Sequence, residues 1–126
     1  MAKRIAVIND DTDFLTLLEE LLADEGYEAR AFREGKDSYK QVREYAPHGI
    51  VLDIRMESPE TGWKVLELFK LDPALSTVPI IICSADMLQL QERAVYLKTK
   101  GCEVLPKPFD LNDLLTLLER TAGGPE

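Results

Sequence analysis

The sequence is poor in several features that mark particular protein classes. Its 126 residues include 2 cysteines and 1 histidine. Cys83 and Cys102 are too few for a disulfide framework and suit a reducing compartment. One histidine, His48, excludes a histidine-based metal cluster formed by this chain alone. No segment approaches the roughly 20 apolar residues that span a bilayer, and no apolar run resembles a signal peptide. We therefore expect a cytoplasmic protein with no membrane association.

Positive charge is also scarce. The chain has 15 Lys and Arg against 23 Asp and Glu, which gives a formal net charge of −8. Non-specific binders of nucleic acids need a basic face, so we expect no direct binding of nucleic acid. The hydrophobic content of 45% excludes disorder as the global state. The length favours one domain, predicted over residues 1–122, with 123–126 as a tail or the start of a linker.

Short apolar runs alternate with segments of helical periodicity. The candidate strands are 5–8, 27–32, 50–52, 78–83 and 104–105. The candidate helices are 14–22, 39–45, 63–69, 87–100 and 111–118. Most runs are rich in β-branched residues without polar alternation, as in strands covered on both faces, whereas 27–32 carries the charges of an edge strand. The pattern predicts an α/β fold, a (βα)5 doubly wound parallel sheet of five strands.

Polar residues follow the inner strands at the point where each strand ends. The acidic segment 9–11 follows the first strand, Asp53 ends the third, Ser84 follows the fourth, and Lys107 follows the fifth. Each residue alone has an ordinary explanation as a helix cap, a turn residue or a solvated lysine. Because the carboxyl ends of parallel strands meet at one edge of the sheet, the combination predicts a functional site there.

The residue types of this cluster indicate phosphoryl transfer. Neighbouring carboxylates repel each other unless they hold a cation or protons. Carboxylate and water oxygens suit Mg²⁺, which often shares its shell with phosphate. A lysine and a hydroxyl can contact phosphoryl oxygens, and an aspartate beside the metal can act as a nucleophile and form an acyl phosphate. We therefore expect Asp53 to accept a phosphoryl group in a Mg²⁺-dependent reaction.

These motifs together resemble the receiver domain of two-component response regulators. The resemblance runs from Ile5 to the last helix and rests on the acidic segment 9–11, Asp53 with the following 54–56, Ser84-Ala85, and Lys107-Pro108-Phe109. It implies a flavodoxin-like fold with strand order 2-1-3-4-5. It also implies a module with self-catalysed phosphorylation and dephosphorylation, not an enzyme that turns over external substrates.

The resemblance assigns roles residue by residue. Asp53 matches the phosphoacceptor, Ser84 the hydroxyl that turns toward the phosphoryl group, and Lys107 the lysine that pairs with it. The implied Mg²⁺ ligands are Asp10, Asp53, the backbone carbonyl of Arg55 and, through a water molecule, Asn9. The Lys107–Pro108 bond is often cis in the family.

The implied partners follow from the same resemblance. The phosphoryl donor is a histidine kinase or a phosphotransfer protein, and the output passes to a downstream effector or output domain. The surface formed by the fourth helix, the fifth strand and the fifth helix is the family's usual partner face, and it is a candidate for homodimer formation.

Three departures from the family pattern favour a second interpretation. Asn9 replaces one of the usual paired acids, Val104 replaces a usual aromatic residue, and Glu57 replaces a usual proline in a loop that places Gly62 one residue late. Loss of one charge is expected to weaken Mg²⁺ binding without abolishing it. The alternative is a receiver-like interaction module that no longer switches by phosphorylation.

The sequence argues against two other functions, a phosphatase and a cofactor binder. A phosphatase of the haloacid dehalogenase type needs a second acid two residues after the nucleophile, where this chain has Arg55. A flavodoxin-like cofactor binder needs a hydroxyl- and amide-rich first loop, and the acids of segment 9–11 would repel the phosphate. An ion pair between Arg55 and Asp86 over the phosphoryl group could slow hydrolysis, with two independent solvated side chains as the alternative.

Overall fold

The β-branched runs form a single parallel sheet in the computed structural model, which describes residues 2–9, 11–33, 36–54, 59–107 and 109–124. The strands are β1 (Arg4–Ile8), β2 (Glu28–Phe32), β3 (Gly49–Asp53), β4 (Ile80–Ser84) and β5 (Cys102–Pro106). The helices are α1 (Thr12–Asp24), α2 (Lys36–Tyr45), α3 (Pro59–Leu71), α4 (Met87–Glu92), α5 (Ala94–Thr99) and α6 (Leu111–Ala122). The strand order β2-β1-β3-β4-β5 confirms the predicted doubly wound fold.

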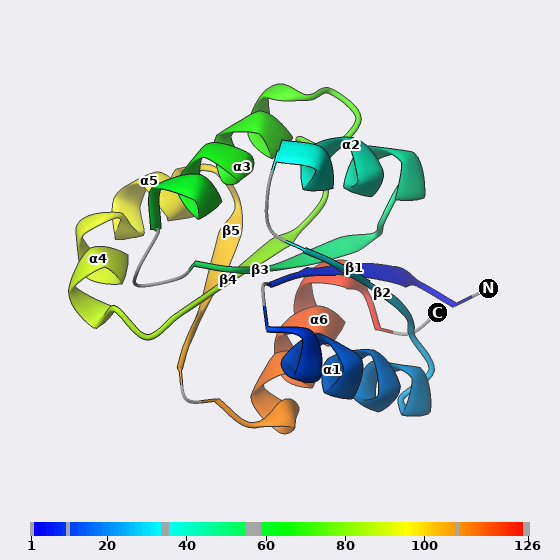
Figure 1. Ribbon diagram of the computed structural model, residues 1–126. Helices are drawn as coiled ribbons and strands as arrows, with labels where there is room; N and C mark the ends of the chain where they lie inside the picture. Colours follow the sequence, from blue (N-terminus) through cyan, green and yellow to red (C-terminus); the bar gives the residue numbers. More distant parts are fainter. Residues whose placement is uncertain (1, 10, 34–35, 55–58, 108, 125–126) are drawn as a thin grey trace.

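The helices cover both faces of the sheet, which explains why the inner strands are apolar throughout. α1 and α6 lie on one face, and α2 to α5 lie on the other (Figure 1). Along β1, Ile5 and Val7 belong to the core beneath α1 and α6, whereas Ala6 and Ile8 belong to the core beneath α2 and α3. The whole of β3 and β4 is buried. β2 lies at the edge and exposes Glu28 and Arg30, as its charges predicted.

The predicted helix 87–100 is interrupted, and this corrects the sequence prediction. α4 ends at Glu92 and α5 begins at Ala94, with Arg93 between them at φ −100° and ψ 4°. The Arg93 guanidinium carbon lies 4.3 Å from the centroid of the buried Trp63 ring on α3. This cation–π contact joins the helix junction to α3, and it depends on residues 30 positions apart in the chain.

Helix ends elsewhere follow the local sequence signals. Asp110 caps α6, because its Oδ1 accepts from the backbone N–H of Asp113 at 3.1 Å. Gly26 follows α1 at φ 94°, the left-handed conformation expected of a residue just past a helix. Among the described residues, no helix is long and apolar enough to cross a membrane.

A buried carboxylate ties α2 to the segment after α3. Asp72 is 5% exposed and follows the last residue of α3. Its oxygens accept from the Tyr39 hydroxyl at 2.5 Å and from the backbone N–H of Ala74 at 2.8 Å. The Arg43 Nε lies 3.2 Å from Oδ2. The carboxylate is therefore held from three sides, two of them on α2.

Candidate functional site

Asp53 lies at the carboxyl end of the central strand β3, in the position that the sequence predicted. Its side chain is 7% exposed, and Oδ1 forms an ion pair with the Lys107 ammonium. Beyond that contact, Oδ1 accepts no further hydrogen bond from the described residues. The backbone N–H of Ile54 donates to the Cys83 carbonyl at 2.9 Å, which keeps the chain fixed just beyond the carboxylate. Within the described residues, the Lys107 ammonium is therefore the group that balances this buried negative charge.

Lys107 reaches this carboxylate from the segment after β5. Its backbone N–H donates to the Ser84 carbonyl at 2.8 Å, so the end of β5 is fixed to the end of β4. The ammonium lies 6.0 Å from the centroid of the Phe14 ring, which packs edge-on against Phe109 at 6.4 Å. Sequence reasoning did not place Phe14 at the site, because an aromatic residue in the apolar stripe of a helix gives no signal beyond core packing.

Ser84 is the last residue of β4 and is 1% exposed. Its Oγ accepts from the backbone N–H of Asp86 at 3.1 Å, so the hydroxyl hydrogen remains available for donation. Asp86 caps α4, because its Oδ1 accepts from the Gln89 N–H at 3.0 Å. This capping contact anchors Asp86 locally, whereas its proposed partner Arg55 lies outside the described residues.

Asn9 follows β1 and is 5% exposed. Its Oδ1 accepts from the backbone N–H of Asp11 at 2.9 Å, and Asp11 Oδ1 in turn accepts from the Phe14 N–H at 3.2 Å, which caps α1. The carboxamide oxygen therefore has one interaction already and a second lone pair left. The predicted ligand Asp10, and Pro108 with its expected cis bond, lie outside the described residues, as do Arg55 and residues 56–58 of the predicted loop. The remaining residues of that loop, 59–62, belong to α3, which corrects the prediction.

Comparison with known proteins shows the family to which the chain belongs. The family model described as response regulator receiver domain matches residues 5–119. The chain belongs to the response regulator receiver domain family. The domain is 33% identical over 117 residues to the DNA-binding transcriptional regulator NtrC of Proteus hauseri, which covers 90% of this chain and 23% of that protein. The chain therefore spans about a quarter of the length of the curated relatives it matches.

Solved receiver domains share the fold over nearly the whole chain. The beryllofluoride-activated NtrC receiver domain is 28% identical and covers 98% of this chain and 96% of its own, with a TM-score of 0.76. The receiver domain of the sensor histidine kinase PA1611 from Pseudomonas aeruginosa PAO1 covers 98% of this chain and all of its own, with a TM-score of 0.81 at 24% identity. That second protein was solved with a magnesium ion coordinated in its active site cleft. The family consists of phosphoacceptor modules and not of enzymes that turn over substrates.

The described part of this receiver domain offers hard oxygen donors where a magnesium ion would be expected. Asp53 contributes a buried carboxylate whose Oδ1 is paired with Lys107, and Asn9 contributes a carboxamide oxygen. Such a donor set suits Mg²⁺ and not a soft metal. The described residues contain no cluster of three or more His, Cys, Asp or Glu side chains, and Asp10 is not among them.

The cysteine beside the site is buried, and its thiol has a raised pKa. Cys83 is paired with Asp53 in the β3–β4 register and is 2% exposed. Burial, and next the negative charge of Asp53, raise the pKa of the Cys83 thiol to about 12. The thiol therefore stays protonated at neutral pH and packs as a buried core residue.

Proposed function

We propose that Asp53 accepts a phosphoryl group from a phosphohistidine of a histidine kinase or a phosphotransfer protein, in a Mg²⁺-dependent reaction within the cytoplasm. One observation carries this proposal. The Asp53 carboxylate is buried at the end of the central strand, and its Oδ1 is paired with the Lys107 ammonium and accepts no further hydrogen bond from the described residues. A buried carboxylate that faces an ammonium at the carboxyl end of a central strand is typical of a functional site.

The phosphoryl group would pass from the imidazole of the donor to the carboxylate of Asp53. A carboxylate oxygen of Asp53 attacks the phosphorus, an O–P bond forms, and the P–N bond of the phosphohistidine breaks. The electron pair of that bond stays on the imidazole nitrogen, which can take up a proton. Lys107 then pairs with a phosphoryl oxygen, and the free hydroxyl hydrogen of Ser84 can be donated to another. Both groups act by stabilising charge, as phosphoryl transfer requires.

Magnesium would be held by the carboxylate of Asp53 and, through a water molecule, by Asn9. Asp10 and the backbone carbonyl of Arg55 are the remaining proposed ligands. When bound, the ion neutralises negative charge on the transferring group. Because Asn9 carries no charge, we expect weaker binding of Mg²⁺ than with an acid at this position.

Phosphorylation would be coupled to a partner face formed by α4, α5, β5 and α6. An effector or an output domain is the proposed partner of this face, and the same face is a candidate for homodimer formation. Val104 on β5 is half-buried and packs against the core cluster that contains Leu97 of α5. Because Val104 has no ring to bury or expose, we expect any coupling to depend on α4 and α5 themselves.

The direct test uses a small acyl-phosphate donor with Mg²⁺. We expect the intact mass to increase by one phosphoryl group, with the modification mapped to Asp53 by borohydride reduction and peptide analysis. The variant Asp53→Asn should remain unmodified, and Lys107→Met should be modified more slowly. Asp24→Asn, at the exposed end of α1, is a control that leaves the site unchanged. An unmodified wild-type protein at saturating Mg²⁺ would contradict the proposal.

The alternative function is an interaction module that no longer switches, and Asn9 and Val104 are the observations that favour it. Beryllofluoride with Mg²⁺ separates the two functions by NMR. Shift changes on α4, α5 and β5 support switching, whereas changes limited to the neighbourhood of Asp53 support the alternative. The variant Asn9→Asp should strengthen Mg²⁺ binding in either case.

A further inference from the structure

We propose that the free edge of β2 pairs in an antiparallel arrangement with β2 of a second copy of this chain. β2 has one neighbour in the sheet, β1. The Glu28 N–H donates to the Lys3 carbonyl at 2.9 Å, and the Phe32 carbonyl accepts from the Asn9 N–H at 3.2 Å. In a parallel pair, alternate residues direct both backbone groups to the same neighbour. Ala29 and Ala31 therefore direct their N–H and C=O groups outward, away from β1.

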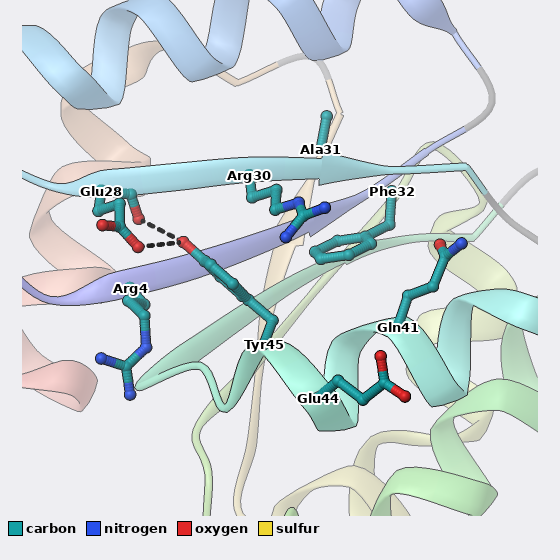
Figure 2. Close-up of a pocket in the computed structure, with 8 residues that line it drawn as sticks. All are labelled: Arg4, Glu28, Arg30, Ala31, Phe32, Gln41, Glu44 and Tyr45. Carbon is teal, nitrogen blue, oxygen red and sulfur yellow. Dashed lines mark hydrogen bonds between the residues drawn. The ribbon is translucent and has the colours of Figure 1, made fainter.

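The side chains of this edge are self-complementary in one register. Glu28 and Arg30 lie two positions apart and project to the same face as Phe32, whereas Ala31 projects to the opposite face (Figure 2). If a two-fold axis passes beside Ala29, the Ala29 residues of the two copies exchange their N–H···O bonds. Glu28 of each copy then lies directly opposite Arg30 of the other copy. This is an isologous contact with two equivalent opposite-charge pairs.

Arg30 is positioned for such a pair, and none of the described residues of its own chain forms an ion pair with it. Its guanidinium carbon lies 5.5 Å from the Phe32 ring centroid and 5.8 Å from that of Tyr45. Within the described residues it makes no ion pair and no hydrogen bond, so its donors remain available. The Tyr45 hydroxyl donates to Glu28 Oε2 at 3.0 Å, which holds the complementary carboxylate on the same face.

A pocket provides space for the incoming side chains on this face. Its volume is about 580 Å³, and its lining includes Glu28, Arg30, Gln41, Glu44 and Tyr45 (Figure 2). It lies between β2 and α2, on the side toward which the charged side chains of an added strand would project. The second copy would therefore add its strand without first displacing a helix.

The charges of β2 oppose one pairing register and favour another. Charged residues on edge strands commonly prevent association. Here, a register centred on Arg30 would bring two guanidinium groups together, whereas the register centred on Ala29 pairs opposite charges. The charges therefore select one arrangement. Because a strand of five residues buries little surface, we expect weak association, distinct from the proposed partner face at the β5 edge.

The test is a charge exchange that only this register explains. We expect wild-type protein to associate reversibly between about 10 µM and about 1 mM, measured by sedimentation equilibrium without any phosphoryl donor. Glu28→Arg and Arg30→Glu should each weaken self-association by about tenfold, because like charges then face each other. An equimolar mixture of these two variants should associate, since every facing pair is again of opposite sign. The double variant should associate like the wild type.

Three outcomes would overturn the proposal. They are a wild-type protein that stays monomeric at about 1 mM, a mixture that associates no better than its components, and a control Glu67→Arg on α3 that weakens association as much as Glu28→Arg. Ala29→Pro removes one outward N–H and no bond to β1, so it should abolish association while circular dichroism shows an intact fold. None of these measurements depends on phosphorylation of Asp53, so this proposal and the proposed function can fail separately.

Discussion

Asp53 and Asp72 are the two buried aspartates of the described structure, and each is 5% exposed. Asp72 accepts from the Tyr39 hydroxyl and from the Ala74 N–H, and it also pairs with Arg43. Asp53 pairs with Lys107 through Oδ1, which accepts no further hydrogen bond from the described residues. Two equally exposed aspartates therefore differ, within the described residues, in the number of groups that contact their carboxylates.

The two aspartates differ in how their carboxylates are supported, and we propose a structural role for Asp72 and a reactive one for Asp53. The hydrogen bond from Tyr39, and next that from the Ala74 N–H, hold the pKa of the Asp72 carboxyl below its ordinary value. Its acceptor capacity is used to join α2 to the end of α3. We propose that the oxygens of Asp53 can still bind a cation or attack phosphorus. Burial is equal at the two positions, so the comparison rests on the partners that the described residues give each carboxylate.

Replacing Asp72 should produce the largest loss of stability. Asp72→Ala removes the acceptor of the Tyr39 hydroxyl and of the Ala74 N–H, and it leaves Arg43 without its partner. We expect the Tm to fall on the order of 10 °C in thermal unfolding followed by circular dichroism. Phosphoryl uptake by the folded variant should be retained. A Tm near that of the wild type would mean that these contacts contribute little.

Removing one hydrogen bond should produce an intermediate effect with a distinct pH dependence. Tyr39→Phe should lower the Tm by about 4 °C at neutral pH. Because the folded pKa of Asp72 lies below the ordinary 3.8, its contribution to stability is present above that value and is lost as the pH falls through the folded pKa.

The acid-unfolding midpoint tests the same substitution. Without the Tyr39 hydroxyl, the pKa of Asp72 should rise toward its ordinary value, so the midpoint of the variant should move to higher pH. Tyr45→Phe is a matched control, since it removes a hydroxyl that donates to Glu28 instead. An equal shift in both variants would contradict a specific role for Asp72.

Replacing Asp53 should change stability less than replacing Asp72, despite the equal burial. Asp53→Asn removes a buried charge with little hydrogen-bond support and leaves Lys107, whose side chain is 31% exposed, accessible to water. We expect the Tm to change by less than about 3 °C. The wild-type Tm should rise on addition of Mg²⁺, and that rise should disappear in Asp53→Asn. A large loss of stability would show that Asp53 is also structural.

The smallest effect is expected from a titratable contact remote from both aspartates. The backbone N–H of Arg4 donates to His48 Nδ1 at 2.9 Å. The backbone N–H of His48 donates to the Arg4 carbonyl at 2.7 Å. Burial, followed by the charges of Arg4 and Lys3, lowers the pKa of His48 below 6.5. Its contribution is therefore full above 6.5 and is lost as the pH falls through the folded pKa.

Acidification from about pH 7 to about pH 5 should then lower the Tm by about 2 °C through this contact. His48→Gln should reduce that pH dependence and leave the acid transition assigned to Asp72 unchanged. A variant that keeps the full dependence would assign it to other groups.

The predictable parts of the site are those that depend on strand ends. Asp53, Ser84 and Lys107 each follow an apolar run, and parallel strands of similar length bring their carboxyl ends together. Phe14 beside Lys107 was not predictable, because its position depends on how α1 packs against the segment after β5. In the sequence, Asp72 has no feature beyond its position before Pro73 at the end of a helix. Its partners Tyr39 and Arg43 lie on another helix, so the sequence does not indicate them.

The sequence by itself determined the element order, the parallel sheet and the edge where polar groups gather, because periodicity and strand chemistry are local properties. Tertiary structure decided which of these groups interact. It placed the Arg93 guanidinium over the Trp63 ring at the junction between α4 and α5. It gave Asp72 three partners, whereas within the described residues Asp53 has the Lys107 ammonium. Contacts between distant segments depend on packing geometry, and spacing along the chain does not encode that geometry in a readable form.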